Sequence, residues 1–131
     1  MSRVVILFPL GDYYSQNNGT PRMFQMDESL IEVLGQAKEI LVHHRVEDKL
    51  DANSGATLTF FHSSLEGDVL NVGMQVTNGL DVSSQPKDIQ TVHGPFAGRM
   101  MAVLDVRDAT QGGPVSQKYV RLEIGATLIM D

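Results

Sequence analysis

The feature that most constrains the fold of this chain is a two-residue alternation of apolar and polar side chains. It recurs in the segments 40–46, 56–64, 70–76, 100–106 and 120–124. Because neighbouring residues of a β-strand point to opposite faces of its sheet, each segment is predicted to be a strand with one buried face. The sequence therefore predicts an all-β protein, an antiparallel jelly-roll-like β-sandwich of about seven to eight strands with at most one short helix. The predicted core residues are Ile40, Val42, Leu58, Phe60, Leu70, Val72, Met74, Val76, Leu104, Val106, Val120, Leu122 and Ile124.

Turn-forming residues predict how these strands pair. The run from Asp51 to Gly55 predicts a hairpin between 40–46 and 56–64. Asn78-Gly79, a strong hairpin signal, predicts a second hairpin between the strand that precedes it and residues 80–83.

The same signals predict the remaining connections. The segment 100–106 is apolar on one face and partly apolar on the other, which is typical of a central strand. Gly125 lies within a long last strand and is expected to mark a bulge or a bend. Gly-Pro-rich segments 84–98 and 108–117 are predicted to be loops, and the polar segment 12–21 a flexible arm.

The segment 28–37 is the one that competes for helix. Asp27 or Ser29 is suited to cap it, and Ser29 with Glu32 has the capping-box spacing. Gly35 interrupts the run after about two turns, and helices this short are marginal without packing. The pattern leaves helix, strand and coil open.

Length and charge limit the domain count and the classes of partner that the chain can bind. A chain of 131 residues corresponds to one domain, 1–131, with 1–26 as an N-terminal strand and arm. Sixteen acidic against ten basic side chains give a net charge of -6, which opposes binding to phosphate backbones and anionic membranes. Because there is no cysteine, disulfides and thiolate sites are excluded. We therefore expect protein partners, with neither nucleic acid nor a membrane.

The apolar stretches of the sequence are too short for a signal peptide or a membrane span. Pro9 closes the N-terminal apolar stretch before the roughly seven to fifteen residues that a signal peptide needs. No run approaches the roughly eighteen apolar residues of a membrane span. The expected location is the cytoplasm or a virion.

The histidines do not form a pattern typical of a metal site. His43 and His44 are neighbours in a strand and so face opposite sides, and neither His62 nor His93 has a second ligand at a metal-binding spacing.

Catalytic signatures are also missing. Ser63-Ser64 lies outside any Gly-x-Ser-x-Gly elbow. Two carboxylate pairs fall in predicted turns, where acidic side chains normally cap backbone amides: Asp48 with Asp51, and Glu66 with Asp68. We predict no enzyme, no catalytic residue, no metal and no cofactor, while a small hydrolase of unrecognised type stays a third hypothesis.

Aromatic side chains support a second hypothesis, a carbohydrate- or ligand-binding β-sandwich module. With no tryptophan and 6% aromatic residues, the candidates for stacking on a ligand are Tyr13, Tyr14, Phe24, Phe61 and Phe96. Met100-Met101 in the predicted central strand indicates adaptable packing, either in the core or at a subunit interface.

The N-terminal apolar run is the candidate assembly segment. The predicted sandwich already has residues for both inner faces, so Val4, Val5, Ile6, Leu7 and Phe8 are surplus to it. A consecutive apolar run suits a strand covered on both faces, which a terminal segment obtains by pairing with the edge of its own sheet or of a neighbour's.

Four short segments carry a resemblance: Leu30 to Gly35, Ile40 to Val46, the run Gly55-Ala56-Thr57-Leu58-Thr59-Phe60-Phe61-His62-Ser63-Ser64, and Lys118-Tyr119-Val120-Arg121-Leu122-Glu123-Ile124. In this order the chain resembles small β-sandwich proteins of bacteriophage structural gene clusters. The resemblance implies a virion component, such as a head-decoration or tail protein, without catalysis. The family's Ser-Asp-Gly turn is replaced here by Leu65-Glu66-Gly67-Asp68.

These observations predict a non-catalytic structural subunit, a phage capsid or tail component. It is expected to form a homo-oligomer or to dock on a larger protein particle. The carbohydrate- or ligand-binding module is the alternative, since β-sandwiches host both functions.

Overall fold

The computed structural model describes residues 1–15, 22–49, 54–63, 69–71, 87–94, 96, 99–108 and 119–130. Within this part of the chain the strands are β1 (Ser2–Tyr14), β2 (Arg22–Gln25), β3 (Glu39–Lys49), β4 (Ser54–Ser63), β5 (Val69–Asn71), β6 (Lys87–His93), β7 (Arg99–Asp108) and β8 (Tyr119–Ile129). A 3-10 turn, η2 (Glu28–Leu30), leads into the short helix α1 (Ile31–Gly35). The predicted all-β class is confirmed.

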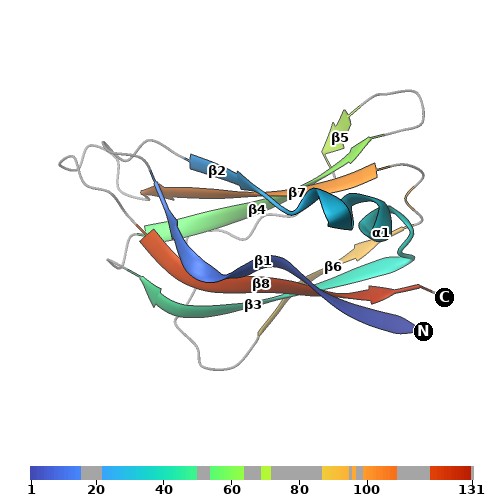
Figure 1. Ribbon diagram of the computed structural model, residues 1–131, viewed down its shortest axis with the longest axis horizontal. Coiled ribbons are helices and arrows are strands. Elements are labelled where there is room, and N and C mark those ends of the chain that lie inside the picture. The colour runs from blue at the N-terminus through green and yellow to red at the C-terminus, as the bar shows by residue number, and fades with distance from the viewer. Residues whose placement is uncertain are drawn as a thin grey trace.

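The strands form two four-stranded sheets in the orders β1-β8-β3-β6 and β2-β7-β4-β5. The sheets lie one above the other, and α1 lies at one end between them (Figure 1). Each of the first four strands pairs antiparallel with one of the last four: β1 with β8, β2 with β7, β3 with β6, and β4 with β5. A long antiparallel ribbon rolled in this way is the jelly-roll topology, so the predicted sandwich type is confirmed.

The predicted hairpin between 40–46 and 56–64 is wrong, because β3 and β4 lie in different sheets. Alternation specifies which face of a strand is buried, but it does not specify which other strand pairs with it. A connection that can reverse a strand within a sheet can equally cross the roughly 10 Å between packed sheets. The second predicted hairpin involves residues 72–83, which lie outside the described residues.

The predicted loop 84–98 is wrong for residues 87–93, which form β6. β6 is an edge strand that pairs with β3. An edge strand needs less apolar sequence than a central one, and it tolerates the flanking Pro86 and Gly94. The predicted loop 108–117 lies outside the described residues except for Asp108, which ends β7.

The predicted arm 12–21 is wrong at its start, because Asp12 to Tyr14 belong to β1. Residues 16–21 lie outside the described residues. β7 lies between β2 and β4, as predicted for a central strand, and β8 is the predicted long last strand.

The core between the sheets is formed by the inward-facing side chains of the strand residues whose burial is described. The predicted core residues whose burial is described are all buried: Ile40, Val42, Leu58, Phe60, Leu104, Val106, Val120, Leu122 and Ile124. Leu7, Phe8, Leu34 and Met100 are also fully enclosed. Full burial of one such side chain contributes roughly 1.5–3 kcal/mol, so this shared core is the main stabilising feature.

The segment that the sequence left open is helical. The Asp27 carboxylate accepts a hydrogen bond of 3.0 Å from the backbone N–H of Ser29, so Asp27 is the cap. Ile31 and Leu34 are buried, and α1 packs against β7. Packing, rather than intrinsic propensity, stabilises so short a helix.

Gly125 does not interrupt β8. The register of β8 with β3 is continuous from Ile124 to Ala126, and the bulge lies opposite, in β1. The glycine is needed for another reason: a Cβ at this position would collide with the imidazole of His43, its cross-strand partner on β3.

Candidate assembly surface

The candidate segment from Val4 to Phe8 lies in β1, at the edge of the β1-β8-β3-β6 sheet. It pairs with this chain's own β8, from Ser2 opposite Ile129 to Ile6 opposite Gly125. The expectation that the whole segment is surplus to the core is wrong, because Val5, Leu7 and Phe8 are buried in it. Val4 and Ile6 remain 65% and 43% exposed.

A β-bulge explains why a consecutive apolar run is not covered on both faces. The register of β1 shifts between Ile6 and Phe8, so Leu7 has no direct partner on β8. Such an extra residue lets two successive side chains turn to the same side of the sheet. Leu7 and Phe8 therefore both enter the core, and Val4 and Ile6 point outward.

The second half of β1 is shaped by a further register shift between Phe8 and Gly11. This stretch contains Pro9, which has no N–H and fits an edge strand. The hydroxyl of Tyr13 donates a hydrogen bond of 2.7 Å to the Pro9 carbonyl. Bulges and proline make an edge unsuitable for further strand pairing, so the regular and open part of the β1 edge is Ser2 to Ile6.

On the outer face of the sheet, Val4, Ile6, Leu41 and Ile129 lie around Thr127, and the same face also carries Ser2, Glu39 and His43. Val4 lies opposite Thr127 on β8, and Thr127 lies opposite Leu41 on β3. Leu41 and Ile129 are half-buried on this outer face. We call Val4, Ile6, Leu41 and Ile129 the apolar patch.

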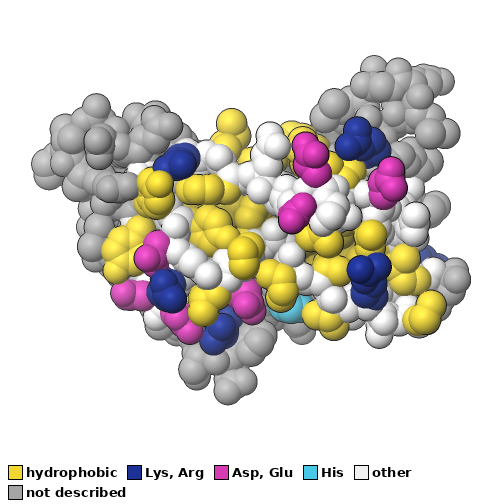
Figure 2. All heavy atoms as spheres, in the orientation of Figure 1, with side chains coloured by type: hydrophobic (Ala, Val, Ile, Leu, Met, Phe, Trp, Pro, Cys, Tyr) yellow, Lys and Arg dark blue, Asp and Glu magenta, His cyan; other side chains and the backbone are white. Residues whose placement is uncertain are grey.

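The other half of the same outer face carries a charged cluster. The Arg121 guanidinium lies 3.1 Å from a Glu47 carboxylate oxygen and 3.3 Å from an Asp12 carboxylate oxygen, and Arg45 also contacts Glu47, at 3.3 Å. These two carboxylates raise the pKa of Arg121. Figure 2 shows basic and acidic side chains interspersed at the lower left, over the end of the sheet away from the chain termini. The patch is therefore bounded at one end by charges that already satisfy one another.

An aromatic cluster joins β1 to β2 and thus links the two sheets. Tyr13 contacts Phe8 and Phe24 edge to face, with ring centroids 6.1 and 5.1 Å away. Arg22 lies 4.4 Å from the ring centroid of Tyr14 and 5.0 Å from that of Phe24. Burial raises the pKa of the Tyr13 phenol. These edge-to-face and cation-π contacts join the rings to one another and to Arg22 within the chain.

The histidines and carboxylates whose side chains the structure describes lie at separate places in the fold. His43 lies over Gly125, and the imidazole Nδ1 of His93 lies 3.6 Å from a Glu39 carboxylate oxygen on the neighbouring strand. Asp48 accepts a hydrogen bond of 3.0 Å from the Tyr119 hydroxyl, which raises the pKa of that hydroxyl. Among the described residues, no three His, Asp or Glu side chains are grouped so as to hold a metal ion. Asp51, Ser64, Glu66 and Asp68 lie outside the described residues, as do the side chains of His62 and Ser63.

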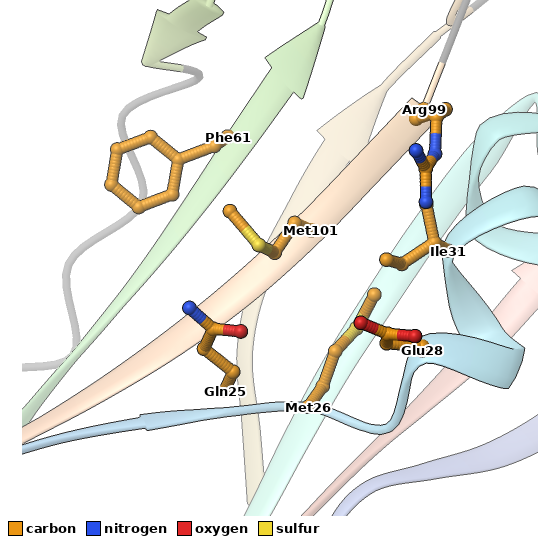
Figure 3. A pocket seen from close by; sticks show the side chains of 7 residues that line it. All are labelled: Gln25, Met26, Glu28, Ile31, Phe61, Arg99 and Met101. Atoms are coloured by element: carbon orange, nitrogen blue, oxygen red, sulfur yellow. The ribbon is translucent and has the colours of Figure 1, made fainter.

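A pocket of about 260 Å³ opens on the outer face of the other sheet. It is lined by Gln25, Met26, Glu28, Ile31, Phe61, Arg99 and Met101 (Figure 3). Phe61 and Met101 are the predicted residues that it includes. No sequence pattern indicated a pocket at the others, because they come from β2 and the residue after it, η2, α1 and β7, and meet only in the fold. Phe96, the remaining aromatic candidate, is buried.

Across the residues that the structure describes, the topology and the exposed edge define a jelly-roll sandwich of eight strands that carries the apolar patch on one outer face. In the described part of the chain, no helix has the length and apolar character needed to cross a membrane. No protein-family model matches the sequence, and no curated protein sequence matches it.

Solved structures do match the fold. The chain is similar to a point mutant of the VP2 protein of infectious bursal disease virus in derived T=1 particles, with a TM-score of 0.53 and 11% identity over 99% of this chain and 32% of that chain. Structures of the Gt and Gx strains of the same virus match at TM-scores of 0.46 and 0.45, with 12% identity each, over 97% and 98% of this chain and 32% and 33% of theirs. The chain thus spans about a third of the length of these proteins. At 11% identity the first match shows a shared fold, and the two lower scores support no argument.

Proposed function

We propose that this chain is a non-catalytic structural subunit of a virus-type particle, a phage capsid or tail component, and that it associates with further copies of itself through β1. The observation that carries the proposal is the exposure of Val4 and Ile6 on an edge strand of a jelly roll. The similarity to a protein seen in T=1 particles supports it at the level of the fold.

An exposed edge strand usually carries features that prevent association. Natural proteins place lysine, proline or bulges on such strands. In β1, Pro9 and the register shifts come only after Ile6, and Arg3 is the one charged side chain of the stretch before it. The stretch from Ser2 to Ile6 presents Val4 and Ile6 outward beside a regular backbone edge, which suits contact with another β-protein.

The apolar patch indicates which face of the sheet makes this contact. Val4, Ile6, Leu41 and Ile129 lie on one face, so an approaching copy buries them together. Burial of apolar area contributes about 25 cal/mol per Å² before the costs of association are subtracted. The charged cluster beside the patch stays at the solvated rim, as charges commonly do at interfaces.

Paired lysine substitutions test the proposal. We expect the unmodified chain to form an oligomer in solution, and the double variant Val4→Lys with Ile6→Lys to be monomeric, because two ammonium groups would have to be buried in the contact. Both side chains are outward, so the melting temperature should change little. The measurement is light scattering after size-exclusion chromatography, with circular dichroism for folding.

Met23→Lys is the matched control. Met23 is apolar, 71% exposed and on an edge strand, but it belongs to β2 in the other sheet. The control should keep the oligomer. A chain that is monomeric at high concentration, or a Val4/Ile6 double variant of unchanged mass, would contradict the proposal.

A further inference from the structure

We propose that the pocket on the β2-β7-β4-β5 sheet binds a free α-amino acid with a long apolar side chain. The site is formed by one basic and one acidic side chain at one end of an apolar floor. It lies on the opposite sheet from the apolar patch, so this inference is independent of the assembly proposal.

Arg99 and Glu28 form the charged end of the pocket. Arg99 is the first residue of β7, Glu28 is the first residue of η2, and both are exposed. Figure 3 shows them with Ile31 on the side of the pocket next to the helix. Although both line the pocket, no ion pair joins them to each other or to another described residue. A ligand that carries a carboxylate and an ammonium group can therefore pair with both.

The chemistry of this end matches the head of an amino acid. A guanidinium binds a carboxylate through two parallel N–H···O bonds, and these charge-assisted bonds are stronger than neutral ones. The Glu28 carboxylate accepts hydrogen bonds from an ammonium group. A ligand with one charge alone would leave either Arg99 or Glu28 without its partner in the complex.

The floor of the pocket suits an apolar side chain. Met101 and Phe61 are direct cross-strand partners on the outer face of β7 and β4, and Met26 and Ile31 add apolar surface. In Figure 3 Met101 lies between the charged end and Phe61. Methionine side chains adapt to ligands of varied shape and contact aromatic edges favourably.

The size of the pocket favours a small ligand. Its volume of about 260 Å³ lies below the roughly 300–1,000 Å³ of sites for drug-sized molecules. Gln25, Glu28 and Arg99 could hydrogen-bond a sugar, but a sugar is the less suitable occupant, because Phe61 is the single aromatic residue among the described lining residues and the rest of the floor is aliphatic.

Calorimetric titration of the full chain with L-leucine and L-methionine tests the assignment. Isocaproate, which lacks the ammonium group, and isoamylamine, which lacks the carboxylate, serve as analogues of leucine. Loss of a hydrogen bond to a charged group costs about 1.5–3 kcal/mol, so each analogue should bind at least about tenfold more weakly than L-leucine. Simple sugars should not bind.

Charge-neutral variants locate the binding. Arg99→Gln and Glu28→Gln should each weaken L-leucine binding about tenfold or more without a change in melting temperature, because both side chains are exposed. Glu32→Gln is the matched control: it removes an exposed carboxylate from α1, outside the pocket. The proposal is overturned if neither amino acid binds, if an analogue or a sugar binds as well as L-leucine, or if the variants bind like the control.

Discussion

The cross-strand pair of His43 and Gly125 shows how one residue can depend on another across a sheet. The imidazole occupies the space above Gly125 that a side chain would otherwise fill. A missing side chain weakens a strand, and an aromatic ring from the next strand can cover the gap. The glycine that sequence patterning interprets as a bulge is therefore a site of cross-strand packing.

Gly125→Ala should lower the free energy of unfolding by about 1 kcal/mol, the low end of the range for overpacking, because His43 can rotate toward solvent. In a His43→Ala background the same substitution should be neutral or stabilising. Urea denaturation of the four proteins gives the coupling energy. An equal cost in both backgrounds would show that His43 is not the obstacle.

Tyr13 is predicted to make folding stability sensitive to alkaline pH. Burial raises the pKa of Tyr13 from its ordinary value of 10.0, so the phenolate is disfavoured in the folded state. The stability that depends on the neutral phenol is therefore fully present below about pH 10, and it is lost as pH rises through the folded-state pKa.

Tyr13→Phe should remove this dependence, and it should also cost about 0.5–1.5 kcal/mol near pH 7, because the hydrogen bond to Pro9 is lost. Denaturant melts at pH 8 and pH 11 provide the measurement. If the variant loses as much stability between these pH values as the unmodified chain, another group is responsible.

At the scale of the element, the helical segment depends on its cap. Asp27→Ala should destabilise the protein by about 1 kcal/mol, since the N–H of Ser29 then loses its acceptor. Ser29→Ala should have little effect, because the Ser29 backbone donates this bond and its side chain is exposed. Thermal denaturation of both variants measures the difference, and a larger loss in Ser29→Ala would reverse the assignment of the cap.

The elements differ in how well sequence predicts them, and the differences have physical causes. Burial is a property of one strand's own alternation, so Leu58, Phe60 and Leu122 are assigned correctly. Strand pairing depends on distant segments, so β3 and β4 are wrongly joined as a hairpin. β6 is missed because its position at an edge requires little apolar sequence.

The candidate surface was predictable in part. Hydrophobicity locates the segment that contains Val4 and Ile6, yet it cannot show that a bulge turns Leu7 and Phe8 inward together. The pocket is beyond sequence patterning, because Glu28, Phe61 and Arg99 belong to separate elements. Sites formed within one strand are therefore more accessible to sequence than sites formed between strands.

At the scale of the whole molecule, β1 has two roles that one deletion can separate. It completes the sheet by pairing with β8, and the backbone N–H of Met130 donates a 2.9 Å hydrogen bond to the Met1 carbonyl, which holds the two ends of the described chain together (Figure 1). It also presents Val4 and Ile6 outward. The first role concerns stability, and the second concerns association.

Deletion of residues 1–10 should therefore unfold the protein or make it aggregate, rather than produce a smaller folded species. The deletion removes Val5, Leu7 and Phe8 from the core, a loss of about 5–9 kcal/mol at roughly 1.5–3 kcal/mol each, against a total stability of about 5–15 kcal/mol for a typical domain. It also exposes the stretch of β8 from Ile124 to Ile129 as a new and largely apolar edge. The Val4→Lys/Ile6→Lys variant keeps the three buried side chains and should stay folded. Circular dichroism and light scattering on the two proteins measure this contrast, and a cooperative melt of the truncated chain near the temperature of the full chain would show that β1 is dispensable for the fold.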